Sequence, residues 1–173
     1  QVSRQLFQNA ANLQIVARAG LGLDNIDVPA ASEAGIVVTN TPEQNAITVA
    51  ELTIGLLLSL ARKIPAADRH ARSGGWDRQA FMGVELYGKT LGVVGFGRIG
   101  FLTAMRAKAL GMRILAYDPY LSPDAVTLAE TQAQLAPLED LLAQSHAVTC
   151  HLPGGAGTRG LLGEAAFRQM RPG

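Results

Sequence analysis

Cysteine, charge and aromatic side chains are all scarce in this sequence. Cys150 is the only cysteine among 173 residues, so no disulfide can form within the chain. This cysteine usage fits a reducing compartment, and we expect a cytoplasmic location. Because Cys150 ends an apolar run, we expect it to be a small buried hydrophobe. Charged residues make up 17% of the chain and apolar residues 48%, which favours a packed core over disorder.

The sequence also lacks a basic run and a long apolar segment. Its formal net charge is +1, so no strong field attracts nucleic acid or an anionic membrane, and we expect neither as a partner. The longest apolar tract, Ile47–Ala61, is shorter than the roughly 20 residues of a spanning helix and does not lie at the N-terminus. We expect a buried helix, in which Glu51 must find a partner or meet solvent.

The two ends of the sequence suggest an incomplete polypeptide. The chain begins at Gln1 rather than at Met, and it ends with the turn-forming run Arg171-Pro172-Gly173. We therefore expect an internal fragment, truncated at both ends.

Apolar runs of strand length alternate with helical patterns along the chain. This rhythm predicts parallel strands in a doubly wound α/β fold. The expected helices are 3–10, 28–34, 43–62, 65–73, 99–110, 138–143 and 164–170, and the expected strands are 13–17, 36–39, 91–95, 113–117 and 147–151. The helix 43–62 is apolar on most faces, so we expect it to pack between domains or against another subunit.

A glycine pattern follows the third expected strand and opens a helix. Gly95, Gly97 and Gly100 form a G-x-G-x-x-G motif. Such glycines provide a tight turn, a close approach of the backbone to a pyrophosphate, and close packing of helix on strand. The first amides of the helix also favour an anion, and Arg98 can support the phosphates. The motif predicts a dinucleotide site.

An acidic residue ends the next expected strand. Asp118 is placed to accept both hydroxyls of an adenosine ribose, and its charge would repel a 2′-phosphate, so NAD is favoured over NADP. The simpler alternative is that Asp118 only caps the turn at Asp118-Pro119.

The histidines give no metal pattern. His151 ends a strand, and we expect it in the wall of the adenosine pocket rather than as a catalytic base. We expect His70 to be solvated and His146 to lie at the surface. Because no histidine or cysteine has ligand spacing, we predict no metal.

Arg18 follows the first expected strand and precedes Gly20 and Gly22. Exposed amides beside a guanidinium can bind an anion, and the alternative is a surface salt bridge with an aspartate. Asn45 can cap the long helix.

These runs together resemble the D-isomer-specific 2-hydroxyacid dehydrogenases, along almost the whole chain. The matching segments are Arg18–Asp27, Asn40–Pro42, Ala50–Thr53, Gly88–Gly100, Tyr117–Pro119 and His151–Pro153, together with Trp76 and Phe81–Gly83. The resemblance implies the end of a flavodoxin-like substrate domain over residues 1–41 and an incomplete Rossmann-type NAD-binding domain over 42–173. It also implies a homodimer formed by the long helix and the segment around Trp76.

The resemblance assigns roles to individual residues. It places pyrophosphate contacts on Arg98 and Ile99 within the Gly95–Gly100 turn, and the ribose contact on Asp118 beside Pro119. Further cofactor contacts fall on Leu21, His151, Leu152 and Pro153. Substrate carboxylate contacts fall on Arg18, Gly20, Gly22 and Asn45. Leu152 departs from the Thr that close relatives often carry, which keeps a backbone contact but removes a hydroxyl.

The family's catalytic Arg, Glu and His are expected beyond Gly173, so the resemblance implies that these 173 residues alone are inactive. The resemblance favours 3-phosphoglycerate as the substrate, with glyoxylate or hydroxypyruvate as the alternative. A non-catalytic NAD-sensing corepressor is the alternative from another class.

Overall fold

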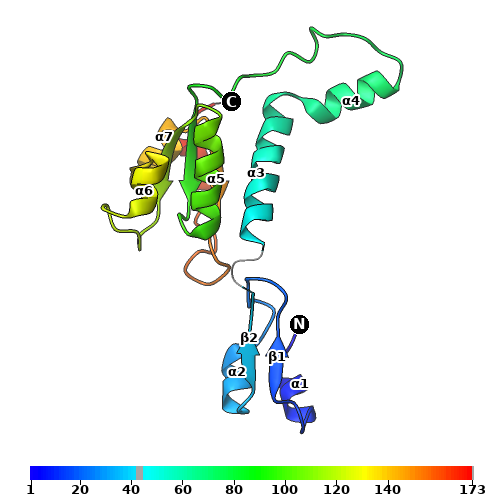
Figure 1. Ribbon diagram of the computed structural model, residues 1–173, viewed down its shortest axis with the longest axis vertical. Coiled ribbons are helices and arrows are strands. Elements are labelled where there is room, and N and C mark those ends of the chain that lie inside the picture. Colours follow the sequence, from blue (N-terminus) through cyan, green and yellow to red (C-terminus); the bar gives the residue numbers. More distant parts are fainter. Residues whose placement is uncertain (42–44, 173) are drawn as a thin grey trace. The chain divides into compact units, whose positions relative to one another are not determined.

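The computed structural model describes residues 1–41 and 45–172, which form two compact units (Figure 1). The first unit comprises Gln1–Ala46 with Pro153–Gly160, and the second comprises Ile47–Leu152 with Leu161–Gly173. The strands of each unit pair in parallel, which confirms the predicted α/β class.

The first unit is a small strand–helix–strand layer. Its elements are α1 (Arg4–Asn9), β1 (Ile15–Ala17), α2 (Val28–Glu33) and β2 (Val37–Thr39). Strand β1 pairs with β2 in the register Ile15 to Val37. Asp27 begins α2 by accepting the amide of Ala30 at 3.0 Å, a favourable N-cap. The core residues are Phe7, Ile26, Ala30, Ala31 and Ile36.

The second unit is built on a four-stranded parallel sheet. Its strands are β3 (Thr90–Val94), β4 (Arg113–Tyr117), β5 (Gln134–Leu135) and β6 (Ala147–Cys150), in the order β5-β4-β3-β6. Strand β3 is buried along its whole length, as expected for a central parallel strand. The chain passes from β3 to β4 on one side and returns to β6 on the other, so the carboxyl end of β3 is the switch point of the sheet.

Helices cover both faces of this sheet. They are α5 (Arg98–Ala109), α6 (Val126–Thr131), α7 (Leu138–Gln144) and α8 (Glu164–Gln169). Leu91 and Val93 pack in one core cluster with residues of α5 and α6. Val94 packs in a second cluster with residues of α7 and α8. Alternate side chains of β3 therefore point to opposite faces of the sheet, and each set packs against the helices on its own face, as in a doubly wound fold.

Two further helices precede the sheet, α3 (Ala46–Ala61) and α4 (Ile64–Arg72). The predicted start of α3 at Glu43 lies outside the described residues. Ile54 and Leu57 of α3 pack on the α5 core cluster, and Glu51 forms an ion pair with Arg106 at 3.3 Å. In contrast, Leu60 is 80% exposed. The expectation that α3 is buried on most faces is therefore wrong for this chain by itself, because only one of its faces meets the core.

The sequence patterns also missed two short elements, α6 and β5. The segment 76–87 is irregular, as predicted. Within residues 1–41 and 45–172, no helix is both long and apolar enough to cross a membrane.

Candidate dinucleotide-binding site

The three glycines of the turn between β3 and α5 have three different surroundings. Gly95 has φ +88°, and a Cβ there would lie 2.7 Å from the carbonyl oxygen of His151. A Cβ on Gly100 would lie 2.2 Å from the carbonyl oxygen of Gly95. A Cβ on Gly97 would meet no atom within 4 Å. Gly95 and Gly100 are thus required by the fold, whereas Gly97 leaves open space beside the backbone.

Helix α5 begins at this open space. Gly97 is its N-cap in an extended conformation and provides no side chain to cap the first turn. The free amides at the start of a helix, together with the helix dipole, favour a negative charge. Arg98 is exposed in the same turn. The start of α5 therefore offers backbone donors and a nearby cation to an anionic group.

Asp118 lies immediately after β4 and contacts the glycine turn directly. Its Oδ2 accepts the amide N–H of Phe96 at 2.9 Å, and its Oδ1 accepts the amide N–H of Tyr120 at 3.0 Å. Asp118 therefore caps the turn, and its predicted ribose contact stays a prediction. Each carboxylate oxygen has a second lone pair, so the group retains acceptor capacity for hydroxyls. The two amides fix the orientation of the carboxylate.

The amide of Gly95 donates to the carbonyl of Tyr117 at 2.8 Å, which adds a second contact on the β4 side of the turn. On the other side, the residue after β6 contacts the end of β3, because the amide of His151 donates to the carbonyl of Val94 at 2.8 Å. The Oγ1 of Thr149 lies 3.0 Å from Nε2 of His151. Burial lowers the pKa of His151 below its ordinary value of 6.5, so the ring is neutral near neutral pH. The half-buried His151 is thus a neutral, hydrogen-bonded residue beside the glycine turn.

These features fit a dinucleotide. The diphosphate needs a backbone without side chains and a helix N-terminus, and the ribose needs an anchored carboxylate at the next strand. The residues present would hold it through the amides of Arg98 and Ile99 and through Asp118. Because Gly97 has open space where a side chain would stand, the cradle is compatible with close approach of a diphosphate.

The predicted anion residues of the first unit lie at the end of β1. The guanidinium of Arg18 donates from Nε to the carbonyl of Gly22 at 3.1 Å. Asn40 donates to the carbonyl of Leu21 at 2.8 Å, and the amide of Thr41 donates to Gly20 at 3.1 Å. The ends of β1 and β2 therefore shape this loop. Arg18 makes no ion pair among the described residues, so the salt-bridge alternative finds no support there.

The remaining predicted site residues flank these elements. Asn45 is exposed immediately before α3, and Pro119 is exposed beside Asp118. The side chain of Leu152 packs beside the turn: a Cβ added to Gly95 would lie 3.0 Å from it. The carbonyl of Pro153 accepts from Thr158 at 2.7 Å. Their predicted roles stay predictions.

Two expectations about side chains were wrong. Cys150 is exposed rather than buried, because within the described residues β6 pairs only with β3. Cys150 lines a cavity of about 480 Å³ with residues of α3. His70 is not solvated: its Nε2 is buried without a partner among the described residues, and its ring centroid lies 5.1 Å from that of Phe81. The irregular segment after α4 folds back on the ring, which no local pattern indicated.

The amides that orient Asp118 were also missed. The sequence predicted a carboxylate for the ribose but not its bonds to Phe96 and Tyr120. The Asp118-Pro119 dipeptide signals the turn bond to Tyr120. No signal exists for the bond to Phe96, because it joins residues that only the parallel pairing of β3 and β4 brings together.

A doubly wound parallel sheet, a glycine turn at its switch point and an acid after the next strand define a dinucleotide-binding α/β protein. Residues 54–173 match the model of the D-isomer specific 2-hydroxyacid dehydrogenase, NAD binding domain. The chain belongs to this family and carries its NAD-binding domain.

Individual relatives agree with this assignment. The chain is 47% identical to D-3-phosphoglycerate dehydrogenase of Archaeoglobus fulgidus and 44% identical to that of Rattus norvegicus, covering 100% of this chain and 32% of each relative. Among solved structures, D-lactate dehydrogenase of Aquifex aeolicus, complexed with NAD and lactic acid, superposes with a TM-score of 0.89 at 28% identity. That superposition covers 99% of this chain and 51% of the other. The chain thus spans about a third of the length of the curated relatives it matches.

Proposed function

We propose that the chain binds NAD at the glycine turn, with the diphosphate on the amides of Arg98 and Ile99 and the adenosine ribose on Asp118. The observation that carries this proposal is the 2.9 Å bond between the amide of Phe96 and Oδ2 of Asp118, which sets the carboxylate beside the diphosphate cradle. The negative charge of Asp118 disfavours the 2′-phosphate of NADP. His151 and Leu152 form the adenosine side, and Leu21, Pro119 and Pro153 supply the remaining cofactor contacts.

Bound NAD supplies a hydride acceptor at its nicotinamide. The chain's own residues bind and orient the cofactor. The start of α5 offsets the diphosphate charge, and Asp118 fixes the ribose. The half-buried neutral ring of His151 lies beside the turn without adding charge.

For the whole protein, we assign NAD-dependent oxidation of a D-2-hydroxy acid, with D-3-phosphoglycerate as the substrate. The identities of 47% and 44% to proteins named D-3-phosphoglycerate dehydrogenase favour this substrate over glyoxylate or hydroxypyruvate. A non-catalytic NAD-sensing corepressor is the alternative of another class.

The substrate carboxylate is assigned to Arg18, the amides around Gly20 and Gly22, and Asn45. Among residues 1–41 and 45–172, only Nε of Arg18 forms a hydrogen bond, at 3.1 Å from the carbonyl of Gly22. The two Nη groups are available for a bidentate carboxylate contact. In this assignment residues 1–41 end the substrate domain and residues 42–173 form the NAD-binding domain.

The protein is further assigned as a homodimer through α3 and the segment around Trp76. Leu56 and Leu60 of α3 are 62% and 80% exposed, and Trp76 is 84% exposed. Large apolar side chains clustered on one helix face favour a protein partner. A cytoplasmic location is part of the same proposal and rests on the single cysteine; fractionation of the source cells tests it.

The test of the function is a comparison of substrates and cofactors on the full-length protein. We expect NAD reduction with D-3-phosphoglycerate, with a higher kcat/KM than glyoxylate or hydroxypyruvate gives in the reverse direction with NADH. Binding of NAD without turnover of any 2-hydroxy or 2-oxo acid would favour the corepressor. Absence of NAD binding would overturn the proposal itself.

A further inference from the structure

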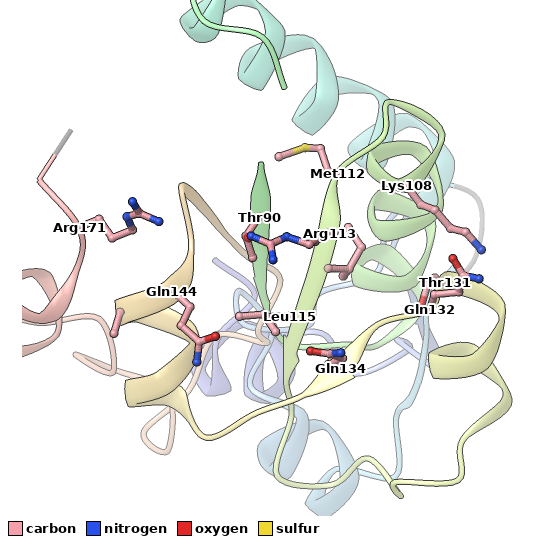
Figure 2. Close-up of a pocket in the computed structure, with 12 residues that line it drawn as sticks. Thr90, Lys108, Met112, Arg113, Leu115, Thr131, Gln132, Gln134, Gln144 and Arg171 are labelled. Atoms are coloured by element: carbon pink, nitrogen blue, oxygen red, sulfur yellow. The ribbon is translucent and has the colours of Figure 1, made fainter. Parts of the chain in front are cut away.

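A polar cavity lies at the amino end of the sheet. It has a volume of about 450 Å³ and is lined by residues at the starts of β3, β4 and β5 and at the end of the chain (Figure 2). Gly95 and Asp118 follow the carboxyl ends of β3 and β4, at the opposite edge. The dinucleotide site of a doubly wound sheet lies at the carboxyl edge, so this cavity needs another explanation.

The cavity has a one-sided charge. Lys108, Arg113 and Arg171 line it, and no Asp or Glu does so among the described residues. Lys108 donates to the carbonyl of Glu130 at 2.9 Å and points away from the centre (Figure 2). Arg113 and Arg171 point toward each other from opposite sides (Figure 2), and neither forms an ion pair in the described part of the chain.

His146 does not line this cavity, but it contacts the lining residue Arg171. The buried amide of Thr90 donates to Nδ1 of His146 at 3.1 Å. With that lone pair in use, the neutral ring carries its proton on Nε2. Nη1 of Arg171 lies 3.3 Å from the same Nε2. Because a guanidinium has only donors, two N–H donors face each other without an acceptor.

The surrounding charges agree with this picture. Burial holds the pKa of His146 below its ordinary value of 6.5, and the charges of Arg171, Lys89 and Arg113 lower it further. A bound anion in the cavity relieves this positive field, because it accepts from Arg171 and neutralises the cations.

We propose that this cavity is an oxyanion site that binds a small phosphate-bearing metabolite, held by the guanidinium groups of Arg113 and Arg171. The side-chain carboxamides of Gln134 and Gln144 also line the cavity, and they can form hydrogen bonds with polar groups on the rest of the ligand. The site is separate from the glycine turn, so it stands or fails independently of the proposed NAD binding.

The test is a titration of the full chain with inorganic phosphate near neutral pH, at constant ionic strength maintained with chloride and in saturating NAD. We follow the ring signals of His146 and the amide signals of Arg113 and Gly97 by NMR. We expect a saturable shift at His146 and Arg113 but not at Gly97. Arg113→Gln and Arg171→Gln should each weaken binding roughly tenfold, because each removes a charged hydrogen bond.

Arg168→Gln is the matched control, because it removes the same charge from α8 at a residue paired with Glu164 at 2.6 Å. It should leave phosphate binding unchanged. Equal weakening by all three substitutions would show non-specific screening and overturn the site. A shift at Gly97 alone, or no saturable shift, would overturn it as well. A further titration with citrate separates phosphate from carboxylate preference, and tighter citrate binding would contradict the phosphate assignment.

Discussion

Phe96 and Asp118 join the glycine turn to the strand beside it. The amide of Phe96 donates to Oδ2 of Asp118 at 2.9 Å, while the side chain of Phe96 is buried in the core below α5. One carboxylate therefore serves the fold and, in our proposal, the cofactor. This double role makes Asp118 the most informative position for substitution.

We expect Asp118→Asn to weaken NAD binding roughly 10- to 100-fold, because a hydrogen bond to a charged group contributes about 1.5–3 kcal/mol. The preference for NAD over NADP should narrow in the same variant, since the charge that repels the 2′-phosphate is gone. Calorimetric titration with both cofactors measures this. Asp140→Asn, at an exposed position of α7, is the control and should change neither affinity. Unaltered NAD affinity in Asp118→Asn would contradict the ribose assignment.

Substitution by alanine should affect stability at one of the turn glycines and NAD affinity at another. Gly100→Ala places a Cβ 2.2 Å from the carbonyl of Gly95, so we expect the free energy of unfolding to fall by about 1–3 kcal/mol, as in overpacked cores. Gly97→Ala meets no protein atom, so stability should be retained while NAD affinity falls. Urea unfolding and NAD titration separate the two effects. Normal NAD affinity in Gly97→Ala would show that no ligand approaches this backbone.

The exposed face of α3 gives a test of assembly. We expect the Leu56→Glu, Leu60→Glu double variant to shift the protein from dimer to monomer in sedimentation velocity, because buried charges without partners are costly at an interface. Val126→Glu on α6, at a residue 69% exposed, is the control and should leave the dimer intact. A monomeric parent protein would overturn the dimer proposal.

The half-buried ring of His151 predicts a pH dependence of stability. Its folded-state pKa lies below 6.5 because of burial, so as pH falls below about 6.5 the unfolded chain takes up a proton that the folded chain resists. The free energy of unfolding should therefore fall with pH in this range. His151→Gln should flatten the fall, measured by urea unfolding at several pH values. His146 acts in the same direction, and an unchanged slope in the double variant His146→Gln, His151→Gln would contradict the prediction.

The sequence patterns predicted most of the fold because buried parallel strands are apolar on both faces and therefore appear in the sequence as apolar runs. Strand β4 is an example: the run Arg113–Tyr117 was predicted at its observed bounds. Helix α6 was missed because it is six residues long and has no side-chain cap at Ala125. Strand β5 was missed because two exposed residues carry no alternation.

The candidate site divides in the same way. The glycine motif is local, so its position could be predicted from the chain alone. The bonds between Phe96 and Asp118, and between Thr90 and His146, join residues far apart in sequence. Their partners are set by the register of β3 with β4 and with β6, which depends on packing rather than on any local run.

On one side, the glycine turn donates hydrogen bonds to Asp118 and Tyr117. On the other side, it packs closely against the backbone of His151. Its shape is therefore fixed before a ligand arrives, and little conformational entropy is left to lose on association. The loop is therefore a preorganised binding site. We expect the on-rate of the dinucleotide to be limited by diffusion rather than by a slow rearrangement of the protein.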